Sequence, residues 1–529
     1  MNRKTLVLPA VAGLLAPVLV ACGGSSGSGS HSAIVIGTTD RFEEAEGTPA
    51  PFDPAAAYDI ASWNVIHSTF QTLLRLPRSG TDPVPDAATK CTFSDRKNEQ
   101  YRCTLRSDLK FSSGRPVTVK DVKFSIDRVL GINFSNGPAS LLANIDRVET
   151  PNDHEVVFQL KTPDATFPQK LATPAAAIVD SGAYAKDKLN KGFDAVGSGP
   201  YKLKTEEKDG RLTKAVLSRN TDYQGAVKTQ NDKIELRFFD DSESMEKALK
   251  DGDIDVMNRS LDPGQIGPLS NASDKGVKLT DSPGQEIGYL VFNTDDPAVK
   301  PKAVRQAVAQ LVDRQALTRD GYDRTADPLY SMVPSGITGH QTSFYNQYQD
   351  PSADKARTLL RSAGVSTPVK FTISYSSGHY GPAQAKAYQA LAKQLNASGL
   401  FDVQLQDIKW SQYRSDAAKG MFQAYGMGWF PDFPDPDNFI APFFGKDNFL
   451  HSPYRNAKLE ALVPQSRQVA QRDAATKYFQ QAQDMIADEV PVLPLWQSKQ
   501  YIATRDNITG AEWALNACSE LQMWELGGA

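Results

Sequence analysis

Cysteine and histidine are scarce in this chain of 529 residues, which contains four of the first and six of the second. The cysteines form no CxxC pair, and the histidines follow no metal-binding spacing such as HExxH. The glycine-rich segment Gly197–Tyr201 is too short for a phosphate-binding loop and predicts a tight turn. A dinucleotide-binding fingerprint is also absent. We therefore expect no metal, no cofactor and no enzymatic activity, although a hydrolase built from scattered aspartates stays open.

An excess of charge of one sign is also lacking. The 58 basic and 62 acidic residues are mixed along the chain, and the formal net charge is −4. Because there is no basic block, we expect no nucleic acid partner. A hydrophobic content of 40% and a charged content of 23% are typical of globular proteins. The length exceeds that of one ordinary hydrophobic core, so two or three domains are expected.

Long apolar runs are missing except at the N-terminus. Arg3 and Lys4 precede an apolar stretch from Leu6 to Ala21, which two prolines and a glycine interrupt and small residues follow. This pattern is typical of a secretory signal peptide, which we place at residues 1–21, and it is too short for a spanning helix. No later run of 18 apolar residues occurs.

The end of that apolar stretch, Leu19–Cys22, resembles the bacterial lipobox. The resemblance implies that Cys22 receives a diacylglycerol and becomes the first residue, which takes the formal net charge from −4 to −6. Residues 22–32 then form a flexible Gly/Ser tether. We expect a protein anchored by lipid to the extracellular face of the cytoplasmic membrane. An ordinary secreted protein with a stray cysteine is the alternative.

A short hairpin is expected between Lys90 and Arg106. Two strand-like segments flank a polar turn, and Cys91 and Cys103 are equidistant from Lys97. This spacing places the two cysteines opposite one another, and an exported protein can keep such a disulfide. Cys518 is then unpaired, unless the cysteines follow a different scheme.

Strand-like and helix-like patterns alternate along the rest of the chain. Residues 33–38 and Tyr289–Phe292 are rich in apolar and β-branched residues, as buried strands are. Thr118 and Asp121 have the spacing of a capping box, and apolar residues at helical intervals follow them. Such alternation predicts an α/β protein with a parallel-rich sheet. The prolines in Val490–Trp496 make that extended run an edge strand or a crossover.

The segment Tyr425–Phe444 combines seven aromatic residues with Asp432, Asp435 and Asp437. Its four prolines predict an extended loop rather than a helix. A stiff aromatic loop with carboxylates can hold a positively charged organic group. Alternatively, the aromatic side chains fill a core and the aspartates cap turns.

Six stretches, taken together, resemble the extracellular solute-binding proteins of family 5, which deliver peptides and some other solutes to ABC importers. They occur in the order found in that family and span nearly the whole mature chain. The stretches are Leu19–Cys22, Tyr101–Val129, Val196–Leu203, Tyr289–Leu317, Gly428–Phe439 and Val490–Trp496.

The resemblance implies a two-lobed, type II-like periplasmic-binding-protein clamp with three domains. The first lobe would be assembled from residues 33–75, 195–287 and 490–529, and the second from residues 288–489. An extra domain specific to the family would occupy residues 76–194. Crossovers near Gly288 and Val490 would form the hinge, because two strands that join lobes can absorb closure through small changes in φ and ψ.

The resemblance also implies a peptide site. In peptide binders of this family, an aspartate of the GW-x-x-D segment pairs with the free α-ammonium, and Asp432 occupies that position, with Trp429 as a pocket wall. Asp435 and Asp437 are then expected in turns, and the phenylalanines that follow in the core. Candidates for the ligand's carboxylate are Arg414, His379 and Tyr380. The expected ligand-binding residues are Asp432, Trp429, Tyr425, Trp410, His379, Tyr380 and Arg414.

From the resemblance we expect a monomeric receptor that captures peptides by lobe closure and passes them to the permease subunits of an ABC importer. One alternative keeps this receptor and changes the solute to a metal chelate, a siderophore-like compound or an oligosaccharide. The other alternative is a tethered hydrolase or a chaperone-like lipoprotein.

Overall fold

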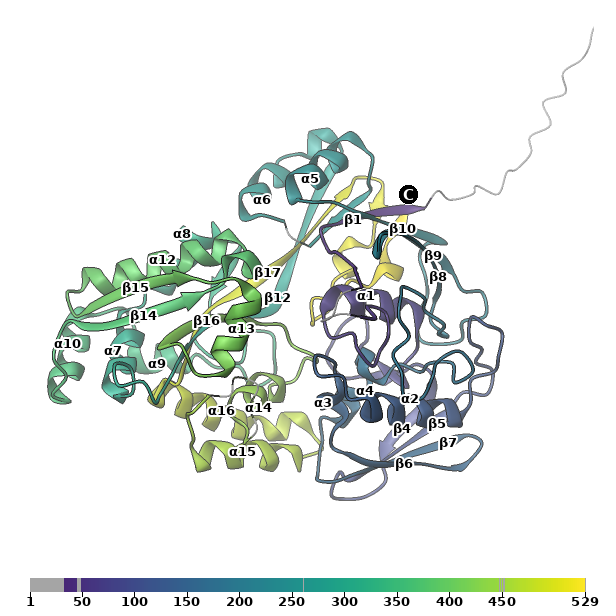
Figure 1. The fold of residues 1–529 in the computed structure, drawn as a ribbon, viewed down its shortest axis with the longest axis horizontal. Coiled ribbons are helices and arrows are strands. Elements are labelled where there is room, and N and C mark those ends of the chain that lie inside the picture. The colour runs from purple at the N-terminus through teal and green to yellow at the C-terminus, as the bar shows by residue number, and fades with distance from the viewer. Residues whose placement is uncertain are drawn as a thin grey trace, which may run out of the picture.

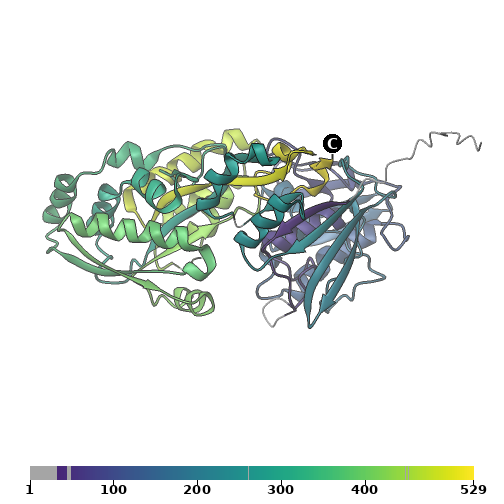
Figure 2. The same ribbon diagram turned by 90° about the horizontal axis from the view of Figure 1, so that it is seen from above.

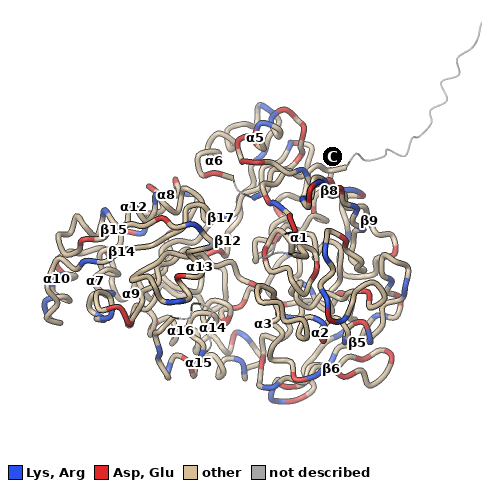
Figure 3. The backbone as a smooth tube through the Cα atoms, viewed as in Figure 1, with Lys and Arg blue, Asp and Glu red and all other residues tan. Residues whose placement is uncertain are grey.

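The computed structural model describes residues 33–44, 49–259, 261–446, 448, 450 and 452–528. The expected signal peptide, the tether and Cys22 lie outside this part of the chain and stay predictions. Among the helices of the described residues, none has the length and apolar character needed to cross a membrane. Basic and acidic residues are interspersed along both halves of the molecule (Figure 3).

A mixed β-sheet runs through both halves of the molecule (Figure 1). Within the described residues it has eleven strands. Ten of them lie in the order β15 (Phe401–Asp407), β14 (Val369–Tyr375), β16 (Ala424–Trp429), β12 (Val277–Phe292), β17 (Val492–Arg505), β11 (Val256–Asn258), β1 (Ile34–Thr38), β10 (Lys233–Phe238), β9 (Arg211–Arg219) and β8 (Tyr201–Lys208). The eleventh, β13 (Ala326–Pro328), pairs with β17.

The strand directions correct the expectation of a parallel-rich sheet. Parallel pairs are confined to β1 with β10 and β11, and to β14 with β15 and β16. The other pairs of this sheet are antiparallel, because β8 and β9 form a hairpin and because β12 and β17 run against each other and against their neighbours. Local alternation of strands and helices could not reveal these long-range partners.

Strands β12 and β17 pass from one half of the molecule to the other (Figures 1 and 2). Their pairing is interrupted by register shifts between Pro283 and Ile287 and between Gly288 and Tyr289. The run Val490–Trp496 therefore leads into a crossing strand. Within it only Trp496 has a described strand partner other than β12, so the rest of the run lies at an edge of the sheet, as expected. Pro494 lies opposite Tyr289, next to the second shift, where a missing N–H disturbs the ladder least.

The crossing strands join the two lobes of an α/β clamp (Figure 2). We call the half with β14, β15 and β16 lobe 2. Its helices are α7 (Lys302–Leu311), α8 (Arg314–Tyr322), α9 (Ser343–Tyr348), α10 (Ala353–Ser362), α11 (Ser377–Tyr380), α12 (Pro382–Ala397), α13 (Trp410–Ala418), α14 (Asp437–Phe444), α15 (Ala457–Arg467) and α16 (Arg472–Glu489).

The other half, lobe 1, contains β1 and β8 to β11. Helices and turns packed there are α1 (Ile60–Thr69), α5 (Ser242–Asp251), α6 (Pro263–Ser270), η2 (Ser273–Lys275), η3 (Ala511–Trp513) and η4 (Met523–Glu525), with the strand pair β18 (Ile508–Thr509) and β19 (Gly527–Gly528).

Next to lobe 1 lies a second, four-stranded antiparallel sheet. Its order is β4 (Ala88–Phe93), β5 (Gln100–Leu105), β7 (Glu155–Leu160) and β6 (Ile145–Asn152). With it are β2 (Leu74–Arg75), β3 (Val84–Pro85), α2 (Val119–Ile132), α3 (Ala139–Leu142), α4 (Phe167–Leu171) and η1 (Pro174–Ala176). The capping box expected at the start of α2 is confirmed, since Asp121 accepts a hydrogen bond of 2.9 Å from the Thr118 N–H.

Cys91 on β4 and Cys103 on β5 lie directly opposite each other. A disulfide joins them. Cys518 is a buried free thiol, and burial raises its pKa well above the usual value. It therefore behaves as a small apolar side chain rather than as a nucleophile.

Helix α14 corrects the expectation that prolines keep Tyr425–Phe444 free of helix. It spans Asp437–Phe444 and includes Pro442. Its three phenylalanines and Ile440 are almost completely buried, so their packing outweighs the loss of one helical hydrogen bond at the proline. The expectation that the phenylalanines lie in the core is confirmed for Phe439, Phe443 and Phe444, which are at most 4% exposed in the core of lobe 2.

Candidate ligand site between the lobes

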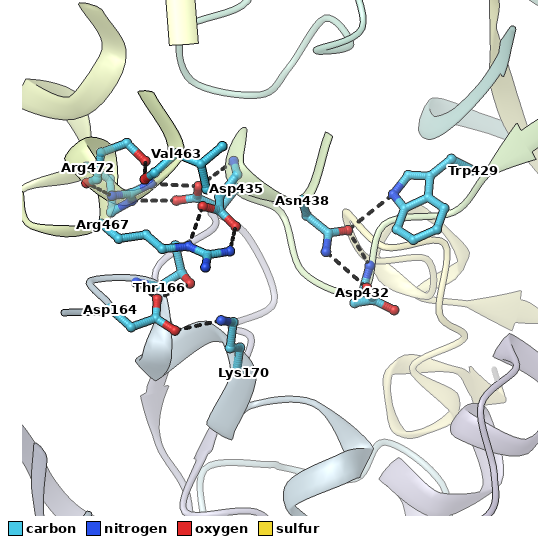
Figure 4. A network of polar contacts seen from close by, with 12 residues as sticks. Asp164, Thr166, Lys170, Trp429, Asp432, Asp435, Asn438, Val463, Arg467 and Arg472 are labelled. Carbon is cyan, nitrogen blue, oxygen red and sulfur yellow. Dashed lines mark hydrogen bonds and ion pairs between the residues drawn. The ribbon is translucent and has the colours of Figure 1, made fainter. Parts of the chain in front are cut away.

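Asp432 lies in the loop between β16 and α14, and Asn438 at the start of α14 fixes its position (Figure 4). The amide nitrogen of Asn438 donates to Asp432 Oδ2 at 3.0 Å, and its oxygen accepts from the Asp432 N–H at 2.8 Å. Trp429 Nε1 donates to the same Asn438 oxygen at 3.3 Å. The second oxygen of the Asp432 carboxylate points away from Asn438 (Figure 4). One acceptor of this carboxylate is therefore held by lobe 2, and the other is directed elsewhere.

The surroundings of Asp432 come largely from the facing half of the molecule. The Tyr58 hydroxyl forms a hydrogen bond with its carboxylate, Glu520 adds negative charge, and Lys170 adds positive charge. Asp432 is only 9% exposed. Burial raises its pKa to about 6, although the hydrogen bonds from Asn438 and Tyr58 act in the opposite direction. The pair of Tyr58 and Asp432 thus bridges the two lobes at a carboxylate that is costly to ionise.

Trp429 and Tyr425 belong mainly to the interior of lobe 2. The Trp429 ring packs edge-on against Phe443 at 5.2 Å, and its indole nitrogen supports Asn438. Tyr425 is 5% exposed and lies in the lobe 2 core. The structure therefore places Trp429 behind the site as a positioning residue and does not bring Tyr425 to it.

His379, Tyr380, Trp410 and Arg414 form a second cluster on α11 and α13. The rings of His379 and Trp410 are stacked, with centroids 3.7 Å apart and planes 1° from parallel. Tyr380 lies edge-on to both rings, at 4.5 and 5.5 Å. The Arg414 guanidinium lies 6.0 Å from the Trp410 ring. Four of the residues expected in the site are thus gathered in one place.

The charge around His379 is positive. Packing of neighbouring atoms, followed by the cations of Arg414 and Arg259, lowers its pKa to about 4. His379 is therefore a neutral hydrogen-bonding group near pH 7. Arg259 follows β11 of lobe 1, so cations from both lobes face this cluster. Arg259 already forms an ion pair of 3.1 Å with Asp40, so Arg414 beside the neutral imidazole is the cation that best suits a carboxylate.

A strand edge lies between these two groups. β14 pairs with β16 only at Ala424 and Tyr425, so the following residues up to Trp429 have no strand on that side within the described chain. The Tyr413 hydroxyl donates to the Gly426 carbonyl at 2.6 Å, and the Gly428 N–H donates to the Tyr380 hydroxyl. Side chains thus occupy main-chain groups that an added strand would use.

Asp435 and Asp437 have more than the turn-forming roles expected of them. Asp437 makes two hydrogen bonds of 2.8 Å with Arg467, and Asp435 is held by Arg472 at 2.7 and 2.9 Å. Only the 2.8 Å bond from the Asp437 N–H to Asp435 Oδ1 is of the expected turn type. The two arginines lie 30 and 37 residues downstream, where the local sequence gives no sign of the pairing.

This network of ion pairs extends from lobe 2 to the region of β4 to β7 (Figure 4). The Asp164 carboxylate lies 2.6 Å from Lys170 Nζ, and Lys170 and Arg467 together lower its pKa to about 2 despite the opposing effect of burial. The Ala165 N–H donates to the Arg467 carbonyl at 2.8 Å, and the Asn98 amide donates to the Gln468 carbonyl at 3.0 Å. Phe433 also packs into the hydrophobic cluster that contains β4 to β7. Lobe 2 is therefore in contact with the region of β4 to β7, away from the crossing strands.

Among the described residues, no group of three histidine, cysteine, aspartate or glutamate side chains is placed to hold a metal ion. The family model for "Bacterial extracellular solute-binding proteins, family 5 Middle" matches residues 82–450, which is more than half of the chain. This chain belongs to that family.

Individual relatives of this family 5 chain agree with the assignment over most of their length. The probable D,D-dipeptide-binding periplasmic protein DdpA of Escherichia coli is 26% identical over 475 residues, covering 87% of this chain and 89% of the relative. The oligopeptide-binding protein OppA of Bacillus subtilis is 25% identical over 524 residues, covering 93% and 94%. The dipeptide-binding protein from Pseudoalteromonas sp. SM9913, solved with Met-Leu, has the same fold, with a TM-score of 0.78 at 19% identity, and the match covers 94% of this chain and 100% of that one.

Proposed function

We propose that this family 5 protein is a receptor that captures peptides between its lobes and delivers them to the permease subunits of an ABC importer. Relatives that match most of its length are named as binders of dipeptides, tripeptides or oligopeptides. The receptor is proposed to act without catalysis, as a monomer held to the membrane through a lipid on Cys22. Residues 33–75, 195–287 and 490–529 would form one lobe, residues 288–489 the other, and residues 76–194 the extra domain.

The observation that carries this proposal is the state of the Asp432 carboxylate. It is buried and oriented by Asn438, and its second oxygen is aimed away from that support. None of the ion pairs among the described residues includes it, whereas Asp164, Asp435 and Asp437 nearby are all paired. The free α-ammonium of a peptide carries one positive charge and three donors, and so offsets the cost of burying this carboxylate.

The rest of the peptide is proposed to follow the unpaired edge of β16. Its main chain would displace the Tyr380 hydroxyl from Gly428 and add as a strand. Its carboxylate would reach Arg414 beside His379. Side chains would point into wet surroundings, so selectivity for most of them should be low.

The pH dependence of binding tests the ammonium site. With a pKa of about 6 in the free protein, Asp432 is mostly ionised at pH 7.5 and mostly protonated at pH 5. The affinity for tri-alanine, measured by calorimetry, should therefore fall as the pH drops below about 6, by up to roughly tenfold per pH unit. Of the groups that face Asp432, burial holds the pKa of Tyr58 well above its usual value, and His67 lowers the pKa of Glu520 against the effect of burial, so neither shift is toward this window.

The matched control for this experiment is N-acetylated tri-alanine, which lacks the positive charge. It should bind weakly and show no such fall between pH 7.5 and 5. Equal affinities for the free and acetylated peptides at pH 7.5 would exclude Asp432 as the ammonium site.

A further inference from the structure

Glu286 is a second carboxylate between the lobes without an ionic partner, and no expectation from the sequence included it. It lies on the crossing strand β12, just before Ile287, which pairs with both Trp429 and Gln497. Its side chain is partly buried. Burial raises its pKa to about 7, against the effects of a hydrogen bond from Ser498 and the charge of Arg259. None of the ion pairs among the described residues includes Glu286, and the nearest cation, Arg259, is already 3.1 Å from Asp40.

The position of Glu286 relative to β16 follows from Gly428. A methyl group built on Gly428 would lie 3.4 Å from Glu286 Oε1 and 2.9 Å from a ring carbon of Tyr380. The carboxylate and the Tyr380 ring therefore both lie above the face of the sheet at this residue, where β16 has no described strand partner on one side. Gly428 precedes Asp432 by four residues, which in extended chain is roughly 13 Å at most. Since an extended peptide advances by the same amount per residue, this upper limit covers the first four residues after an ammonium at Asp432, and the second and third lie well inside it.

Aromatic rings complete the surroundings of Glu286. The hydroxyls of Tyr322 and Tyr380 are close enough for its charge to raise their pKa values. Tyr322 packs against Trp496 at 5.0 Å, so the wall is continuous with the hinge strand β17. The titratable and charged neighbours of Glu286 are thus Arg259 from lobe 1, and Tyr322 and Tyr380 from lobe 2. A carboxylate next to aromatic rings suits a cation with an apolar stem.

We propose that Glu286 is a specificity-determining residue, which binds a basic side chain at the second or third position of the peptide. A lysine, ornithine or arginine side chain would extend past Gly428 with its stem on the Tyr380 ring and its charge on the Glu286 carboxylate. The inference rests on the proposed function, because the position is counted from an ammonium at Asp432. Other side chains would meet no such partner, which makes this receptor permissive except for its preference for a basic residue.

The test compares the tetrapeptides Ala-Lys-Lys-Ala and Ala-Nle-Nle-Ala, in which norleucine keeps the apolar stem of lysine and removes its charge. Calorimetry of the whole protein at pH 8 should show that the lysine peptide binds at least tenfold more tightly than the norleucine peptide. Glu286→Gln should abolish this preference and leave the affinity for tetra-alanine within twofold. The matched control is Asp281→Asn, an exposed carboxylate on the same strand, which should keep the preference.

A second measurement needs no variant. Since Glu286 must be ionised to attract lysine, the preference of the unmodified protein should shrink about tenfold between pH 8 and pH 6, whereas tetra-alanine binding stays nearly constant in that range. If tetra-alanine binds but lysine and norleucine peptides bind alike at pH 8, the role of Glu286 is wrong and the peptide receptor stands. If none of the peptides binds, the proposed function fails first, and this inference fails with it.

Discussion

Replacement of Asp432 by asparagine should weaken the binding of tri-alanine by about 2 kcal/mol or more, which is roughly a 30-fold rise in Kd. The two side chains have nearly the same shape, so the loss comes from removing a buried charge opposite the ligand's ammonium. Asn438 can still hold the asparagine carbonyl at the position of Asp432 Oδ2. Calorimetry at pH 7.5 measures the difference.

The control for this variant is again the acetylated peptide, for which the protein and Asp432→Asn should have equal affinities. The variant should also be at least as stable as the parent at neutral pH. The sign follows from the raised pKa of Asp432: the folded protein favours the neutral form, so the ionised carboxylate costs stability above the unfolded pKa and an amide does not. Unchanged affinity for tri-alanine would contradict the assignment of the ammonium site.

Replacement of Arg472 by methionine should lower the free energy of unfolding by about 3–5 kcal/mol, because it leaves a buried carboxylate without its partner. The Asp435 side chain is 3% exposed, and both of its oxygens accept from Arg472. Asp164 and Asp437 lie close enough to add to the unbalanced negative charge. Methionine keeps most of the apolar stem, so lost packing contributes little. Chemical denaturation followed by tryptophan fluorescence measures the change.

Two further variants separate charge from other effects. Arg319→Met removes an exposed ion pair with Asp320 and should leave the denaturation midpoint unchanged. The double variant Arg472→Met and Asp435→Asn should recover a part of the stability lost in the single variant, because the unpaired charge is gone. A single variant as stable as the parent would show that this network contributes little to the fold.

The identity of the family could be predicted from the sequence. Asp432 and Trp429 are proposed for the site from the resemblance in Gly428–Phe439, and the structure places His379, Tyr380, Trp410 and Arg414 in one cluster. The sequence could not place Tyr425, because its aromatic character is the same as that of its neighbours, whereas in the structure its ring lies in the core of lobe 2.

What the sequence could not reveal depends on contacts between distant segments. Tyr58, Arg259 and Glu286 come from three separate parts of the chain, and none stands in a motif. Only the pairing of β12 with β16 and β17 brings Glu286 to Gly428. Likewise the sheet is mostly antiparallel at its centre because two long strands return between the lobes, which local periodicity does not record. Helix α14 forms in spite of Pro442 for a similar reason, the burial of its aromatic face.

The polar contacts between the halves also bear on how the clamp works. Asn98 and Ala165 reach the main chain at the end of α15, far from β12 and β17 along the chain. The two halves of the molecule are thus joined by the crossing strands and, at a separate place, by these contacts. They also meet at Asp432, which forms a hydrogen bond with Tyr58. The ligand's ammonium would therefore become buried as the lobes close, and its charge would favour the closed arrangement.

The central claim is that the natural ligands are peptides with a free amino end, and identification of the molecule that co-purifies with the protein tests it most directly. Gentle unfolding of the purified protein, followed by mass spectrometry of the released material, should yield a mixed ladder of peptides that all react with an amine-specific label. A single discrete mass that is not a peptide, such as a metal chelate or an oligosaccharide, would contradict the claim.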